Sequence, residues 1–159
     1  MSDFKTGEID GVIIKDLVRY KDGRGWLVEL FRRDVIDEEV FPEMSYISMT
    51  YPDVVRGPHE HREQTDYFCF IGPSTFKMVM WDNRKESATY KNKLILNIGE
   101  NDPKMVIVPP GVVHGYKNIG SDPGLVINLP NKLYAGWDRK EKVDEIRHED
   151  DLNSPFKVD

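Results

Sequence analysis

Arg56-Gly57-Pro58-His59-Glu60-His61 holds two of the four histidines of this 159-residue chain, two positions apart. The stretch follows the apolar pair Val54-Val55, which is typical of a strand. Residues i and i+2 of a strand point to the same face, so His59 and His61 are expected to project together. Imidazole has the unperturbed side-chain pKa nearest neutrality. The pair therefore indicates proton transfer or metal binding, although a solvent-facing strand end would carry the same pattern.

The chain around this stretch predicts many short strands. Glycine, proline and Asp/Asn clusters recur along it and separate runs rich in β-branched and aromatic residues. These runs are residues 11–14, 46–50, 67–71, 76–81, 94–96, 105–108 and 125–129. Such spacing predicts an all-β sandwich or barrel. One or two short helices are expected, chiefly at residues 34–41, where Asp34 would cap the N-terminus.

The composition limits which partners the chain can bind. Its net charge is −6 and it has no block of five or more Lys/Arg residues, so nucleic-acid binding is not expected. A small anionic ligand held by a few arginines remains compatible with this charge. No apolar run approaches the ~20 residues that span a bilayer, and the N-terminus has no signal pattern. We therefore expect a cytoplasmic protein without membrane contact.

The length suits a single domain, residues 1–159. The strands would occupy about residues 10–134, and the charged segment 140–159 would be solvated or packed on a partner. Cys69 is the only cysteine and lies in an apolar run, so we expect a packed thiol and no disulfide framework.

A second histidine motif lies some fifty residues after the first. The pattern Pro109-x-Gly111-x-x-His114-x-x-x-Asn118 resembles the second motif of the cupins, small jelly-roll barrels whose sites lie in the barrel mouth. The earlier His-x-His pair resembles the first cupin motif, with Asp66 or Glu63 in place of its glutamate. The resemblance implies an all-β cupin or jelly-roll β-barrel, the double-stranded β-helix. Three histidines and a carboxylate would also suit iron, manganese or zinc, an alternative that the residues leave open.

Four segments carry a more specific resemblance. They are Asp22–Phe31 (D-x-R-G-x-x-x-E-x-F), Val54–His59 (V-x-R-G-x-H), Asp82–Tyr90 (D-x-R-x-x-S-x-T-aromatic) and Val108–Tyr116 (V-P-x-G-x-x-H-G-aromatic, where the family has I-P-x-G-x-x-H-G-aromatic). In this order they resemble the dTDP-4-dehydrorhamnose 3,5-epimerase family. The resemblance implies an epimerase acting at C3 and/or C5 of an NDP-4-keto-6-deoxyhexose in deoxysugar and surface-polysaccharide biosynthesis. It also implies that no metal and no other cofactor is used.

The resemblance assigns roles to the histidines and to one aromatic residue. His59 matches the base that removes a proton α to the ketone. His114 matches a histidine lining the same cavity, and Tyr134 matches an aromatic residue that packs beside the ligand. His61 and His114 are expected to donate protons or to place the ketone oxygen.

The same resemblance assigns the binding of the diphosphate. Arg24 and Arg56 match residues that hold it, because a guanidinium fork suits phosphate oxygens. Arg24 and Glu29 would come from the swapped N-terminal strand of a neighbouring subunit. The resemblance therefore implies a homodimer.

Three positions depart from the family pattern. The lysine that polarises the ketone is replaced by Thr65 or Asp66, and the general-acid tyrosine is replaced by Asn128. The carboxylate that orients the base has no clear match, and Asp66 or a tail acid such as Asp150 is a candidate. We therefore expect Asp66 and Asn128 in the substrate site.

These departures leave several functions open. The first is an epimerase that inverts C3 alone. Another is a 3,4-ketoisomerase, since that related cupin family carries R-G-x-H-x-H, as residues 56–61 do. A metal-dependent cupin and a sugar-nucleotide-binding cupin without catalysis are the remaining alternatives. Residues 45–50 contain no clear match to the family's thymine-reading residues, so the nucleotide can be dTDP, CDP or GDP.

Overall fold

The computed structural model describes residues 4–159; Met1 to Asp3, part of the N-terminus in which no signal pattern was expected, lie outside the described residues. The strands are β1 (Lys5–Thr6), β2 (Ile13–Asp16), β3 (Arg19–Asp22), β4 (Gly25–Val28), β5 (Tyr46–Thr50), β6 (Val55–Glu60), β7 (Asp66–Phe70), β8 (Thr75–Asp82), β9 (Asn92–Gly99), β10 (Lys104–Val108), β11 (Val112–Asn118), β12 (Gly124–Asn128) and β13 (Ile146–Arg147). Two 3₁₀ turns, η1 (Glu38–Val40) and η2 (Trp137–Arg139), are the helical elements of the described chain. No helix in this part of the chain is long and apolar enough to cross a membrane.

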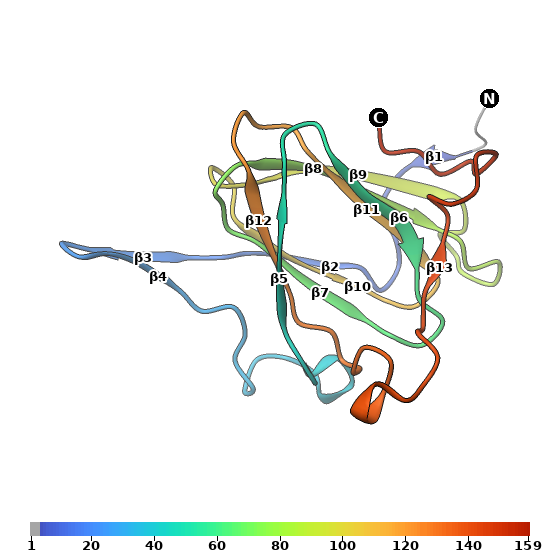
Figure 1. Ribbon diagram of the computed structural model, residues 1–159, viewed down its shortest axis with the longest axis horizontal. Helices are drawn as coiled ribbons and strands as arrows, with labels where there is room; N and C mark the ends of the chain where they lie inside the picture. Colours follow the sequence, from blue (N-terminus) through green and yellow to red (C-terminus); the bar gives the residue numbers. More distant parts are fainter. Residues whose placement is uncertain (1–3) are drawn as a thin grey trace.

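Two sheets face each other and enclose the core (Figure 1). One sheet has the strand order β1-β9-β8-β11-β6-β13, and the other has the order β2-β10-β7-β12-β5. The hairpin of β3 and β4 forms a separate ribbon that projects away from the barrel. The predicted all-β jelly-roll barrel is confirmed.

Alternation along the strands divides the apolar residues among three clusters. The inner faces of both sheets contribute to the central cluster, where Phe68 and Phe70 on β7 meet Phe76 on β8 and Tyr116 on β11. Tyr67 and Cys69 point outward from β7 into a second cluster, which residues 28–40 cover. Burial raises the pKa of the Cys69 thiol to about 12, so this cysteine is a packing residue, as expected.

The charged C-terminal segment packs on the barrel of its own chain. The sequence had indicated that it would be solvated or packed on a partner. β13 pairs with β6, and Phe156 packs against Trp81 on the outer face of the six-stranded sheet. The Asp144 carboxylate accepts hydrogen bonds of 2.8–2.9 Å from the backbone N–H groups of residues 62, 63 and 64. Charge alone therefore misled the prediction, because a few well-placed apolar and capping residues dock the segment.

The predicted helix at residues 34–41 shrinks to the single turn η1, so that prediction was wrong in extent. Asp34 does not cap it and instead pairs with Arg32, at 2.8 Å. Ile36 and Val40 pack beneath the five-stranded sheet. A helix this short is marginal in isolation, so the packing of its apolar residues decides the local backbone conformation.

Candidate active site

A bulge in β6 aims two basic residues into the barrel. His59 lies opposite His114 on β11, and Arg56 lies opposite Tyr116, with a register shift between the two pairs. His59 and Arg56 therefore share the inner face although they are three residues apart. Gly57 adopts a φ of 78° in this bulge, and an added Cβ would lie 2.8 Å from the His114 carbonyl oxygen. Glycine is required here because a side chain would break the approach of β6 to β11.

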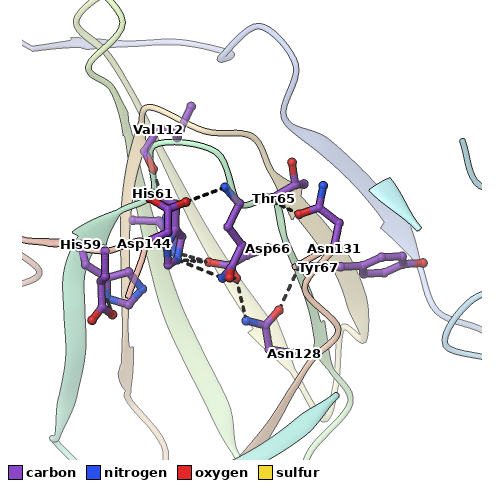
Figure 2. A network of polar contacts seen from close by, with 12 residues as sticks. His59, His61, Thr65, Asp66, Tyr67, Val112, Asn128, Asn131 and Asp144 are labelled. Carbon is purple, nitrogen blue, oxygen red and sulfur yellow. Dashed lines mark hydrogen bonds and ion pairs between the residues drawn. The ribbon is translucent and has the colours of Figure 1, made fainter. Parts of the chain in front are cut away.

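His59, His61 and Asp66 lie close together (Figure 2), and His114 converges on the same point. Their ligand-capable atoms all lie within 4.8 Å of one another. The rings of His59 and His114 have centroids 4.6 Å apart, and His61 is 5.5 Å from His59. Asp66 Oδ2 lies 3.0 Å from the Nε2 atoms of both His61 and His114. The structure thus brings together the three predicted histidines and Asp66.

Both nitrogens of His61 are already engaged within the chain. Nδ1 contacts the carbonyl oxygen of Asp144, and Nε2 faces Asp66. Burial by itself lowers the pKa of His61, but the close contact and charge of Asp66 outweigh burial and raise this pKa to about 9. Burial also disfavours the Asp66 carboxylate, yet the adjacent imidazoles hold its pKa well below the usual range. At neutral pH, His61 and Asp66 therefore form a buried ion pair.

His59 has the opposite protonation state. Burial and the neighbouring His114 lower its pKa to about 3, so it is a neutral imidazole at pH 7. Its side chain is 19% exposed, and Nδ1 lies 3.8 Å from Glu145 Oε1. Glu145 in turn pairs with Arg147 at 2.8 Å. His59 can therefore accept a proton from a bound molecule, and Glu145 would stabilise the imidazolium that forms.

Asn128 connects this cluster to the facing sheet. Its Oδ1 accepts the backbone N–H of Tyr67, which fixes the orientation of the amide. Its Nδ2 donates to Asp66 Oδ1 at 2.8 Å and to the hydroxyl oxygen of Tyr46 at 2.9 Å. Tyr46, on β5, is thereby placed beside the histidine cluster.

A cavity of about 580 Å³ opens over the cluster. His59, His61, Tyr46 and Tyr134 line it, together with Glu145. Cationic side chains also contribute to its wall; they are Arg62, Lys132, Arg139 and Lys142. Four carboxylates line the same wall, Glu63, Glu141, Asp144 and Glu145, and Lys132 pairs with Glu63 at 2.6 Å. A volume of this size suits a small-molecule ligand, and the wall offers charged groups of both signs to it. A smaller cavity of about 170 Å³ lies beneath residues 29–40 and is lined mainly by apolar residues.

Of the predicted residues, His59, His61 and Tyr134 line the cavity, whereas His114, Asp66 and Asn128 are buried behind its wall, so the expectation that His114 lines the cavity was wrong. Arg24, Glu29 and Arg56 lie elsewhere on their own chain. Arg24 is at the tip of the β3–β4 hairpin, where it pairs with Asp22 and has a side chain that is 92% exposed. Glu29 lines the smaller cavity and pairs with Arg32 at 3.5 Å. Arg56 faces the barrel interior but donates to Thr50 Oγ1 and to the Met49 carbonyl oxygen.

The donor set is compatible with a first-row transition metal. Asp66 Oδ2 and His114 Nε2 are buried and have no hydrogen-bond partner of good geometry among the described residues. Three imidazoles and one carboxylate at this spacing suit zinc, iron or manganese. A protonated His61 has no lone pair for an ion, so the ion-pair state and the metal-bound state exclude each other.

The family model of dTDP-4-dehydrorhamnose 3,5-epimerase matches residues 6–150. The chain belongs to this family. A probable low-salt glycan biosynthesis epimerase, Agl13 of Haloferax volcanii, is 43% identical over 136 residues, which cover 84% of this chain and 86% of that relative. The spore coat polysaccharide biosynthesis protein SpsL of Bacillus subtilis is 34% identical over 126 residues, covering 79% and 82%. The family membership predicted from the motifs is confirmed.

Solved structures of the epimerase family share the fold. A dTDP sugar isomerase from Desulfovibrio desulfuricans has a TM-score of 0.81 at 22% identity, covering 94% of this chain and 91% of that chain. A 3'-monoepimerase from Streptomyces bikiniensis, in complex with dTDP-quinovose, has a TM-score of 0.72 at 20% identity, covering 82% and 68%. At these identities the likeness establishes the barrel architecture.

Sequence reasoning missed two residues of the cavity wall, Tyr46 and Glu145. Tyr46 alternates with Ser48 and Thr50 on β5, and this pattern of polar residues on one strand face was a usable signal. Ser48 bonds the Tyr116 hydroxyl and Thr50 bonds Arg56, so this face of β5 points into the barrel. Glu145 gave no signal, because it lies in a charged segment with many other acids. Asp150, the tail acid suggested from the sequence, is exposed.

Proposed function

We propose that the protein epimerises C3 and/or C5 of an NDP-4-keto-6-deoxyhexose, with His59 as the base. The observation that carries the proposal is a neutral His59 facing an open cavity, with Glu145 at 3.8 Å behind it. A proton α to a ketone is weakly acidic, so its removal needs a positioned base and a stabilised enolate. Family membership supports the same reaction class.

The enolate would be stabilised by charge. Both nitrogens of His61 are engaged by Asp144 and Asp66, so His61 acts here through its positive charge and not through a free N–H. His114 holds the other side of Asp66 and directs Nδ1 to the Val112 carbonyl oxygen at 3.0 Å. In this proposal the two histidines fix the potential around the ketone, and His59 moves the proton.

The nucleotide and the diphosphate would lie in the cavity, with the diphosphate near its cationic side chains, such as Arg62 and Arg139, and with Tyr134 beside the sugar or the base. Arg56 and a partner subunit's Arg24 are proposed to complete the phosphate site. A homodimer with exchanged β3–β4 hairpins is supported by the projection of the hairpin (Figure 1) and by the exposure of Trp26 and Leu27 on it. Arg24 and Glu29 would then reach a neighbouring subunit.

The biological setting is proposed from the relatives. The names of Agl13 and SpsL refer to glycan and spore-coat polysaccharide biosynthesis, and that of the Streptomyces structure refers to dTDP-quinovose. A cytoplasmic nucleotide-sugar enzyme that supplies a deoxysugar for a surface glycan accords with these names.

The first test follows deuterium by NMR in D2O, with dTDP-, CDP- and GDP-4-keto-6-deoxyglucose as substrates. We expect solvent deuterium at C3, or at C3 and C5, together with a sugar of inverted configuration. His59→Asn should abolish the exchange while the protein remains folded. A ketone that moves from C4 to C3 would establish the 3,4-ketoisomerase instead, and exchange at full rate in the variant would remove His59 from the mechanism. Substrate binding without any exchange would establish a binding protein.

The convergence of His59, His61, Asp66 and His114 favours a metal-dependent cupin as the second candidate. An ion held by these residues would act as a Lewis acid on the ketone oxygen. Metal analysis of the purified protein, followed by chelation, separates the two candidates. Activity that persists in metal-free protein supports the proposal made here, whereas stoichiometric metal that is lost together with activity supports the alternative.

A further inference from the structure

Inversion at carbon requires two groups on opposite sides of the sugar. A base that removes a proton and returns it from the same side restores the original configuration. The second group must therefore hold a transferable proton and line the cavity from the wall that faces His59. His59 lies on β6 of the six-stranded sheet, so the donor is to be sought on the five-stranded sheet.

Tyr46 meets this positional requirement. It lies on β5 of the five-stranded sheet and lines the same cavity as His59 and Glu145. Its neighbours Ser48 and Thr50, on the same strand face, bond residues of the opposite sheet, so this face is directed across the barrel. The residue is 45% exposed, which leaves the phenol accessible to a ligand.

The hydrogen bonds of Asn128 determine which way the Tyr46 proton points. Because Asn128 Oδ1 accepts from Tyr67, its Nδ2 must face Asp66 and Tyr46, and both of its hydrogens are used. The phenol oxygen therefore accepts at this contact. Among residues 4–159 the Tyr46 hydroxyl donates no hydrogen bond, so its proton is available to a ligand in the cavity.

The same contact would stabilise the phenolate that forms when Tyr46 gives up its proton. A phenolate formed at Tyr46 would still accept the Asn128 N–H, now as a stronger, charge-assisted hydrogen bond. A phenol is protonated at neutral pH; partial burial and the charge of Asp66 raise the pKa of Tyr46 further, to about 12, and the Asn128 hydrogen bond partly offsets this rise.

Other phenols near the site lack one of these features. Tyr134 lines the cavity, but its hydroxyl has no hydrogen-bonded support in the described chain. Tyr116 is buried, and its hydroxyl bonds Ser48 inside the barrel.

We propose that Tyr46 is the catalytic acid that delivers a proton to the carbon deprotonated by His59, from the opposite face; this inference rests on the proposed epimerase function. His59 takes the α proton, and the C–H electron pair enters the enolate. The enolate carbon then takes the Tyr46 hydroxyl proton as the electron pair returns to carbon. Tyr46 regains a proton from water and His59 releases one, so the reaction is neutral overall. Asn128 is a positioning residue that holds Tyr46 and stabilises its phenolate.

Tyr46→Phe tests the assignment, with Tyr51→Phe as the matched control, because Tyr51 is 62% exposed and does not line the cavity. The wild-type protein and both variants are incubated in D2O with dTDP-4-keto-6-deoxyglucose, or with whichever of the CDP and GDP sugars the wild type exchanges. Deuterium and configuration at C3 and C5 are followed by NMR. The affinity for the nucleotide diphosphate and the thermal midpoint are measured in parallel.

We expect Tyr46→Phe to lose inversion by about 10²-fold or more while it still places deuterium in the recovered, uninverted sugar. Exchange survives because His59 can return a solvent-derived deuteron to the face it deprotonated. Tyr51→Phe should invert at nearly the wild-type rate.

Inversion by Tyr46→Phe at the wild-type rate would overturn the role of Tyr46 and leave the epimerase function standing. Equal losses of exchange and of inversion in Tyr46→Phe would have the same consequence. A wild-type protein that exchanges no carbon-bound proton with any of the three sugars would overturn the epimerase function itself, and the role of Tyr46 with it.

Discussion

Replacing Asp66 by asparagine should reveal the buried charge that organises the histidine cluster. Asp66 is 1% exposed and lies 3.0 Å from both His61 and His114. The amide can keep its oxygen toward the Asn128 and Gln64 donors that Asp66 now accepts, and turn its NH2 toward the two imidazoles. The substitution therefore removes a charge and retains the shape and most of the hydrogen bonds.

The magnitude follows from the pKa of His61. A rise from 6.5 to about 9 corresponds to about 3 kcal/mol of preference for the charged ring, since one pKa unit is worth about 1.4 kcal/mol. Loss of one partner of a buried pair costs ~3–5 kcal/mol in other proteins, a consistent range. We therefore expect the free energy of unfolding to fall by about 3 kcal/mol at pH 6.

The directions of the two pKa shifts determine how the free energy of unfolding changes with pH. The pKa of His61 is raised on folding, so its stabilisation is complete below 6.5 and is lost as the pH rises to about 9. Asp66, whose pKa is lowered, contributes above the ordinary carboxyl pKa of 3.8. The wild-type protein should thus lose stability between pH 6.5 and 9, whereas Asp66→Asn should not. The difference between the two proteins should shrink toward zero above pH 9.

Urea unfolding of chelator-treated protein at pH 6 and pH 9, followed by tryptophan fluorescence, measures both quantities. Asp102→Asn is the control, because this carboxylate is exposed and pairs with Lys104 at the surface. Its effect should stay within about 0.5 kcal/mol. An equal loss for Asp66→Asn at both pH values would show that the pair is not charged and would refute this account of the cluster.

Three further outcomes are expected. Glu145→Gln should lower kcat by roughly 10²-fold with little change in KM, because the carboxylate 3.8 Å from His59 would stabilise the His59 imidazolium. Asp150→Asn is the matched control, and equal effects of the two substitutions would contradict this role of Glu145. Arg24→Ala should leave the fold intact yet weaken nucleotide-diphosphate binding about tenfold by calorimetry, and a fully active monomer in sedimentation would exclude the exchanged hairpin. Phe70→Ala should cost ~3–5 kcal/mol in urea unfolding, because this ring is fully buried among Phe68, Phe76 and Tyr116, whereas Leu152→Ala, 91% exposed, should cost almost nothing.

The fold was readable from the chain because its signals are local. Short β-branched runs between turn residues predict strands whatever lies around them, and strands of this number and length can bury their apolar faces only by packing sheet on sheet. The exceptions were segments whose conformation depends on contacts with residues far away along the chain. Residues 34–41 lacked the length to form a helix alone, and the tail docked through Asp144 and Phe156 despite its charge.

The candidate site was only partly readable. The sequence by itself determined that His59 and His61 share a strand face, that a third histidine begins a later strand, and that the chain resembles one family of epimerases. Those conclusions need a two-residue period and a few motifs, which are properties of neighbours along the chain. Tertiary structure alone decided that Asp66 lies between two imidazoles and that Glu145 stands behind His59. It also decided that Asn128 donates a hydrogen bond to the hydroxyl oxygen of Tyr46, 82 residues away along the chain. Such contacts join four or more separate strands, and protonation states follow from the burial and charge that those contacts create, so no local pattern of residues can encode them.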